Sequence, residues 1–241
     1  MLGRDHRDLL SVATRPAAPP LLLALAILGG AALVVVGLLT GAALGRSSAA
    51  VVPDEQSVDA GFARDMQVHH GQAVEMSVLV RDRSSDPDIR GLALDIMLTQ
   101  QNQQGKMAGW LQTWGLRQSS TLPVMGWMST FADDGMAGMD MDDEPGSEAT
   151  GVPESPMVAM GLATEDEMAA LSAAEGVTAE RLYLQLMIDH HRGGVEMASV
   201  AVEEASQPQV RRLAEAMVAG QTSEIDRLSE LLDARGGPLT G

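Results

Sequence analysis

The segment Met-Ile-Asp-His-His-Arg-Gly-Gly-Val-Glu-Met at residues 187–197 decides how the whole chain is organised, because it has a twin. Residues 66–76 are Met-Gln-Val-His-His-Gly-Gln-Ala-Val-Glu-Met. The first Met, both His and the closing Val-Glu-Met of the two segments all lie 121 residues apart. Four of the five histidines in the chain belong to these two His-His pairs. A repeat in constant register indicates an internal duplication, with one unit that carries Met and His in each copy.

Apolar residues around each His-His pair recur at alternating steps of three and four, which is typical of the buried face of a bundle helix. We expect these helices over about residues 57–83 and 179–205. The two predicted stripes are Phe62, Met66, His69, Ala73, Met76 and Val80, and Tyr183, Met187, His190, Gly194, Met197 and Ala201.

Each predicted helix is followed by a break and a proline, and Pro87 and Pro208 are again 121 residues apart. Because proline suits the first turn of a helix, second helices are expected over about 87–115 and 208–235. An isolated hairpin would leave its apolar stripe exposed, so the two copies should pack on each other. The sequence therefore predicts an all-α fold, a four-helix bundle with a pseudo-twofold axis.

The N-terminal region has the features of a membrane anchor. Residues 1–20 form a short tail with three arginines, whereas Leu21–Gly45 contains no charged residue. A helix of that length would reach about 37 Å, enough to cross a hydrocarbon core, and the arginines favour a cytoplasmic tail. We expect one transmembrane helix and a largely extracytoplasmic chain. Cleavage near Ala49 and Ala50 is the alternative, and it would give a secreted protein.

A linker at residues 46–56 leads into the expected bundle domain, residues 57–241. This domain divides into hairpin A (57–116), an acidic Met-rich insert (117–163) and hairpin B (164–237). Thr164 and Glu167 have the spacing of a capping box, which predicts a short helix to about residue 174. The insert carries Met136, Met139 and Met141 among carboxylates. It is either a further site for soft metal ions or a solvated loop.

Composition and motifs exclude several function classes. The net charge of −17 argues against nucleic acid, whose phosphates need a basic surface. The absence of cysteine excludes disulfides and thiolate metal sites. The chain contains no His-Glu-x-x-His and no Glu-x-x-His motif, and no Ser-His-Asp set can be assembled. The sequence therefore predicts a protein that is not an enzyme, with a ferritin-like metalloenzyme as the weaker alternative.

The residue types of the repeat point to a metal site. Imidazole and thioether are soft to borderline ligands that suit copper, above all Cu(I). His69 and His190 are expected inside the bundle, and His70 and His191 at its edge, because one residue turns a helix by about 100°. One shared site and two separate sites both stay open, as does a structural role for the histidines. The candidate ligands are Met66, His69, His70, Met76, Met187, His190, His191 and Met197.

Polar residues interrupt the apolar stripes of the two second helices. A buried amide or carboxylate needs a partner, and the facing imidazoles are the natural ones. We expect these residues to orient the histidines, or to fix the helix register, with Glu224 also a possible ligand. They are Gln100, Gln103, Gln221 and Glu224.

The sequence resembles the bacterial "domain of unknown function 305" family over about residues 57–236. The resemblance rests on Leu-Tyr-Leu-Gln-Leu-Met-Ile-Asp-His-His at 182–191, Val-Glu-Met-Ala at 195–198, and Gly-Leu-Ala-Thr-Glu-Asp-Glu-Met-Ala-Ala-Leu at 161–171. It also includes Pro208, Arg211, Leu213, Ala214, Gln221, Glu224 and Ile225. The family often has Glu-Gly-Ala after the His pair, whereas this chain has Gly-Gln-Ala at 71–73 and Arg-Gly-Gly at 192–194.

The resemblance implies a secreted or membrane-anchored helical bundle related in fold to ferritins. The family includes the cyanobacterial copper-binding protein CopM, which implies copper binding through the eight Met and His residues named above. We expect a membrane-anchored extracytoplasmic protein that sequesters or delivers copper, with a partner for transfer still to be identified. The alternative is a bundle that binds no metal and docks a basic partner through its acidic insert.

Overall fold

The computed structural model describes residues 20–46, 52–120, 122–128 and 156–239. The chain divides into two compact units, residues 1–51 and 52–241. The described part of the first unit is helix α1 (Pro20–Arg46). Among the described residues, no helix combines the length and the hydropathy expected of a membrane span. The anchor predicted for Leu21–Gly45 is therefore not confirmed, and the predicted tail lies almost wholly outside the described residues.

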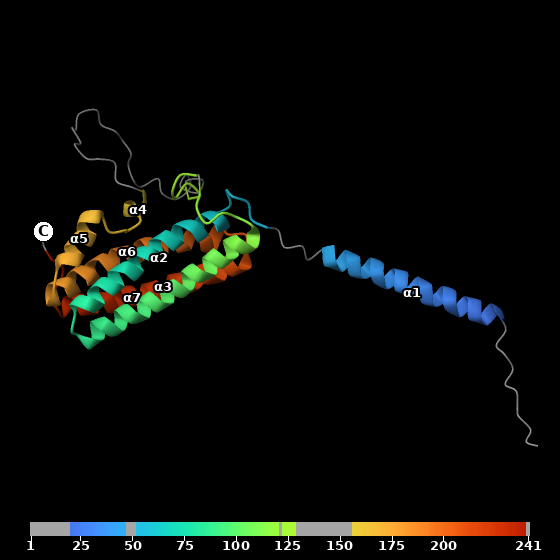
Figure 1. Ribbon diagram of the computed structural model, residues 1–241, viewed down its shortest axis with the longest axis horizontal. Helices are drawn as coiled ribbons and strands as arrows, with labels where there is room; N and C mark the ends of the chain where they lie inside the picture. Colours follow the sequence, from blue (N-terminus) through green and yellow to red (C-terminus); the bar gives the residue numbers. More distant parts are fainter. Residues whose placement is uncertain (1–19, 47–51, 121, 129–155, 240–241) are drawn as a thin grey trace, which may run out of the picture. The chain divides into compact units, whose positions relative to one another are not determined.

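Four long helices form the second unit (Figure 1). They are α2 (Val58–Arg83), α3 (Pro87–Trp114), α6 (Gly176–Glu204) and α7 (Pro208–Asp233), with the shorter α4 (Pro156–Ala159) and α5 (Glu165–Ala173) between the hairpins in sequence. Helix α2 packs on α3, α6 packs on α7, and the two hairpins meet where α2 packs on α6. The described residues contain no strand. The predicted all-α helical bundle is confirmed.

Local sequence explains where α2, α3 and α5 begin. Ser57 accepts a hydrogen bond from the Ala60 N–H at the start of α2, and Asp86 caps α3 just before Pro87. Thr164 and Glu167 form the predicted capping box of α5. Helices α6 and α7 differ, because their N-cap residues Glu175 and Gln207 make no side-chain capping bond.

A residue from the other hairpin holds the turn that leads into α7. The Asp59 carboxylate on α2 is buried and accepts hydrogen bonds from the Ser206 N–H, the Ser206 hydroxyl and the Gln207 N–H, at 2.8 to 3.0 Å. The duplication places Glu180 at the position equivalent to Asp59. Glu180 accepts from the Ser84 hydroxyl at 2.6 Å, in the turn of hairpin A. We call these reciprocal contacts the crossed clasp, since each hairpin holds the turn of the other.

The apolar core consists of two clusters along the bundle. The first contains Met66 and Met197, together with Phe62, Met107 and Met217. The second contains Met76 and Met187, together with Tyr183, Ile96 and Leu228. Because His69 and His70 lie between Met66 and Met76 on α2, and His190 and His191 between Met187 and Met197 on α6, the four histidines lie between the two clusters.

Candidate metal centre

His69 on α2 and His190 on α6 face each other where the two hairpins meet. Both side chains are fully buried, and their ring centroids are 3.7 Å apart with the planes tilted by 35°. The His190 Nε2 donates to the His69 backbone carbonyl at 2.8 Å. The His69 Nε2 donates to the Met160 carbonyl at 3.2 Å. The sequence correctly placed both residues inside the bundle.

His70 and His191 were expected at the edge, and that expectation is wrong. Both are fully buried, each with its ring centroid 6.1 to 6.3 Å from that of the adjacent His. The cause is a side chain that reaches over from the second helix of the same hairpin. The His70 Nε2 donates to Gln103 Oε1, and the His191 Nε2 donates to Glu224 Oε2, both at 2.7 Å.

The acceptors of these hydrogen bonds fix which ring nitrogen carries the proton. Carbonyl and carboxylate oxygens accept hydrogen bonds and cannot donate them, so Nε2 is the protonated nitrogen in each imidazole. The Nδ1 atoms of all four rings are buried and have no hydrogen-bond partner among the described residues. Each imidazole therefore offers a bare nitrogen lone pair, which is the form that binds metal ions.

Burial keeps three of these rings neutral, those of His69, His70 and His190. Loss of solvation lowers the pKa of His69 to about 3, with a further contribution from His70. It lowers the pKa of His70 to about 4, and it holds the pKa of His190 well below the ordinary value for an imidazole. The Nδ1 lone pairs of these three rings are thus available throughout the neutral range.

The four methionines of the repeat form two pairs, and the histidines lie between these pairs along the bundle. Met66 packs in the same cluster as Met197, and Met76 in the same cluster as Met187, and all four side chains are fully buried. In the described part of the chain, no three His, Asp or Glu side chains converge as a ready metal site. The donors that the structure offers are therefore imidazole and thioether, and no metal site is already assembled from them. Met136, Met139 and Met141 lie outside the described residues.

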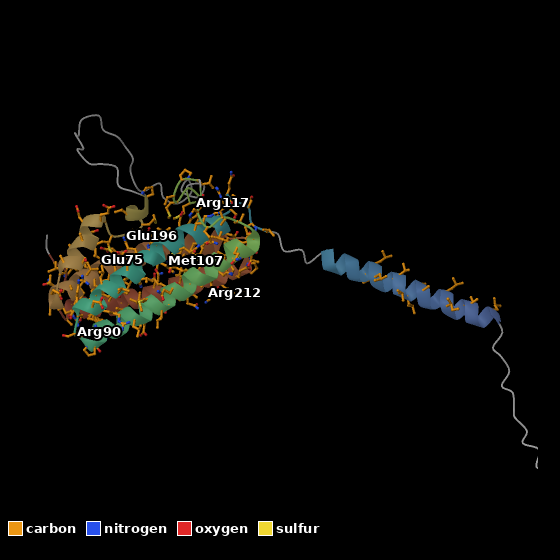
Figure 2. The ribbon with its side chains drawn as sticks, viewed as in Figure 1. Glu75, Arg90, Met107, Arg117, Glu196 and Arg212 are labelled. Atoms are coloured by element: carbon orange, nitrogen blue, oxygen red, sulfur yellow. The ribbon has the colours of Figure 1, made fainter. Side chains whose placement is uncertain are left out.

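The two carboxylates of the repeat lie outside the centre. Glu75 and Glu196 occupy equivalent positions on α2 and α6, and both are exposed (Figure 2). By contrast, Gln100 on α3 and Gln221 on α7 are buried, and neither amide atom of either residue has a hydrogen-bond partner in the described structure. Burying an amide without a hydrogen-bond partner raises the free energy of the folded state. These two side chains therefore indicate that the centre has polar groups ready to bond a further ligand.

A short segment that the sequence did not assign to the site covers His69. Its residues 160–163, which we call the strap, follow α4 and carry the Met160 carbonyl that accepts from His69. The Gln72 amide holds the other end of the strap through two bonds of 2.7 Å, one to the Ala163 carbonyl and one from its N–H. The feature of the sequence that permits this contact is a glycine at position 193. A Cβ at Gly193 would lie 1.7 Å from the Met160 carbonyl oxygen, so only glycine admits the strap.

We expect Gly193→Ala to displace the strap and to destabilise the bundle by about 1–3 kcal/mol, the range typical of overpacking. Urea unfolding gives the free-energy change, and hydrogen exchange at the Ala163 N–H reports the strap itself. Gly220→Ala is the matched control, because Gly220 lies within α7 and no atom approaches its Cβ position within 4 Å. That control should be stabilising, since alanine favours helix. A stability gain in both variants would contradict the role given to Gly193.

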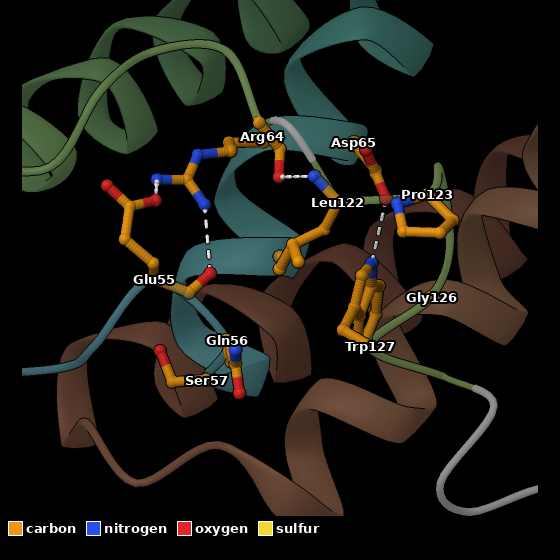
Figure 3. Close-up of a pocket in the computed structure, with 11 residues that line it drawn as sticks. Glu55, Gln56, Ser57, Arg64, Asp65, Leu122, Pro123, Gly126 and Trp127 are labelled. Carbon is orange, nitrogen blue, oxygen red and sulfur yellow. Dashed lines mark hydrogen bonds and ion pairs between the residues drawn. The ribbon is translucent and has the colours of Figure 1, made fainter.

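A cavity lies at the start of α2, and Figure 3 shows it in close-up. Its two charged side chains on α2 are already bonded. Arg64 donates to Glu55 and to the Arg117 carbonyl, and Asp65 accepts from the Trp127 ring at 2.9 Å. These polar groups are paired, unlike those around the four histidines, so the histidine group is the stronger candidate for a functional site.

Comparisons with known proteins place the chain in a family. The model of the family described as "Domain of unknown function (DUF305)" matches residues 59–232. A crystal structure of a DUF305 protein from Streptomyces coelicolor, described as secreted, is 44% identical, covers 78% of this chain and 99% of its own, and has a TM-score of 0.65. A DUF305 fragment from Deinococcus radiodurans is 31% identical, covers 73% and 96%, and has a TM-score of 0.55.

Solved structures of CopM are also similar to this chain. CopM in the Cu(I)-bound form is 20% identical, covers 73% of this chain and 96% of its own, and has a TM-score of 0.49. No curated protein matches the chain.

Proposed function

The chain belongs to the DUF305 family, and on that premise we propose that its bundle is an extracytoplasmic copper-binding module that sequesters or delivers the ion. One observation carries the proposal. Four buried imidazoles each hold the Nε2 proton on an oxygen acceptor and leave Nδ1 bare, between two pairs of buried methionines. A purely structural histidine would use both ring nitrogens or expose one to water.

The donor set fits copper in its reduced state. Neutral imidazole and thioether prefer Cu(I), whereas Mg²⁺ and Ca²⁺ prefer sites built from oxygen ligands alone. His69, His70, His190 and His191 would supply nitrogen, and Met66, Met76, Met187 and Met197 sulfur. The oxygen acceptors on Nε2 orient each ring and raise the basicity of the opposite nitrogen. We propose binding and transfer, with no catalysis.

The location outside the cytoplasm is part of the same proposal. The apolar segment Leu21–Gly45 is long enough to direct export, and it would anchor the chain or be removed near Ala49. The relative from Streptomyces coelicolor is described as secreted, which agrees with this location.

We expect replacement of the four repeat methionines by leucine to weaken Cu(I) binding. The loss should exceed the roughly 10–100-fold that removal of an outer-shell partner costs a metal site, because the sulfur atoms are ligands themselves. Methionine and leucine have similar volumes, so the variant should fold. Competition with a chromophoric Cu(I) chelator measures the affinity, and circular dichroism checks the fold.

The duplication offers a matched control. Met107 and Met217 are also buried, but the other copy carries Leu228 and Ile96 at their positions. The variant Met107→Leu with Met217→Ile therefore removes two buried thioethers that the repeat does not require, and it should keep its Cu(I) affinity. If the four-methionine variant bound Cu(I) as tightly as the unmodified protein, the proposed ligand set would be wrong.

A further inference from the structure

The two copies hold their second histidine in the same way but with different chemistry. In hairpin A, the His70 Nε2 donates to the Gln103 amide oxygen, and in hairpin B, the His191 Nε2 donates to the Glu224 carboxylate. Both bonds are 2.7 Å long and both span 33 residues. The geometry is thus conserved by the duplication, and only the charge of the acceptor differs.

Each copy also carries a buried amide without a hydrogen-bond partner, close in sequence to the residue that accepts from the second histidine. Gln100 lies three residues before Gln103 on α3, and Gln221 lies three residues before Glu224 on α7, so each shares a helix face with the acceptor. Their exposed fractions are 2% and 4%, and neither amide has a hydrogen-bond partner in the described residues. We call His70, Gln100 and Gln103 the A half, and His191, Gln221 and Glu224 the B half.

The charge difference matters because both histidines are fully buried. An ion that enters a site of low dielectric loses its hydration, and this cost rises with the square of its charge. A carboxylate one imidazole away offsets much of the cost for a divalent ion, and it makes the opposite ring nitrogen a stronger donor. A neutral amide orients the ring but offsets no charge. A monovalent soft ion needs less compensation and gains more from thioether sulfur.

We infer that the duplicated centre has two halves of different ion preference. The B half takes a divalent ion such as Cu(II) through His191 with Glu224 behind it, and the A half takes a monovalent soft ion such as Cu(I). Glu224 and Gln103 act through the histidines, so they are positioning residues that determine specificity. This inference rests on the proposed copper-binding function, and it adds that the two copies prefer ions of different charge.

Exchange of the two acceptors tests the inference on the full chain. Glu224→Gln makes the B half resemble the A half, Gln103→Glu does the reverse, and the double variant swaps them. Each variant keeps an oxygen that accepts from Nε2, as the other copy shows, so the fold should survive. Thermal unfolding of the metal-free proteins checks this. Separate titrations with Cu(II) and with Ag(I), a redox-inert substitute for Cu(I), give the affinities.

We expect Glu224→Gln to weaken Cu(II) binding by about 10–100-fold and to leave Ag(I) binding nearly unchanged. Gln103→Glu should add a second tight Cu(II) site, and the double variant should regain one. Equal effects of Glu224→Gln on Cu(II) and Ag(I), or no effect on either, would overturn the inference while copper binding itself stood. Failure of the unmodified protein to bind either ion would overturn the proposed function as well.

Discussion

Acidification of the metal-free protein from pH 7 to pH 4 is expected to unfold the bundle. His69, His70 and His190 are neutral in the folded state, because burial lowers the pKa of each imidazole. The ordinary pKa of these groups is near 6.5. Between that value and the folded pKa, the unfolded chain binds more protons than the folded one, so stability is full above pH 6.5 and is lost as the pH falls.

The size of the effect follows from the two pKa values near 3 and 4. By pH 4, His69 and His70 each cost about 3 kcal/mol, at 1.36 kcal/mol per pH unit below 6.5. Their sum is comparable to the whole stability of a typical domain, about 5–15 kcal/mol. Asp65 acts in the opposite direction, since burial raises the pKa of its carboxyl, but it is one group against three.

Urea unfolding at several pH values, followed by circular dichroism, measures this dependence. Saturation with Ag(I) should shift the acid midpoint to lower pH if the ion occupies the Nδ1 atoms, because bound metal stabilises the folded state. A free energy of unfolding that is equal at pH 7 and pH 4 would contradict the prediction, as would one that is higher at pH 4.

Removal of the Asp59 carboxylate is the second change with a large expected effect. Asp59→Ala leaves three donors in the turn of hairpin B without their acceptor, namely the Ser206 hydroxyl and the backbone N–H groups of Ser206 and Gln207. The expected loss is about 3 kcal/mol or more, since hydrogen bonds to buried charged groups are the costly ones to break. Urea unfolding measures the loss.

Asp88→Ala is the matched control for Asp59→Ala. Asp88 lies in the first turn of α3 and is exposed, so its removal should change stability by no more than about 0.5 kcal/mol. Glu180→Ala should repeat the large effect on the other side of the crossed clasp, because Glu180 holds Ser84 and Arg235. Comparable small losses for Asp59→Ala and Asp88→Ala would show that the clasp contributes little.

Periodicity was sufficient to predict the four long helices. The steps of three and four, and the breaks before Pro87 and Pro208, place their bounds within a few residues of those observed. The same stripes put His69 and His190 inside. Contacts between residues distant in sequence could not be predicted from periodicity, however. Nothing near Asp59 indicates that its partners are Ser206 and Gln207, because a carboxylate in a first turn normally stays with its own helix.

The error on His70 and His191 has a geometric cause. A stripe along one helix predicts the direction toward one neighbour, but α2 packs on both α3 and α6. Two neighbours bury a wider arc of the helix than one, and residues 100° from the stripe fall inside it. The strap was missed for a related reason, since Gly161 and Gly193 are visible in the sequence but their close approach to other backbone is not.

The crossed clasp has a consequence for how this protein arose. Hairpin A holds the turn of hairpin B, and hairpin B holds the turn of hairpin A, as in the isologous interface of a symmetric dimer. A half-length ancestor would thus have paired with a second copy of itself. In such a dimer every position is the same in both subunits. Within one chain that constraint is absent, which allows Gln103 and Glu224 to be different residues at equivalent positions of the duplication.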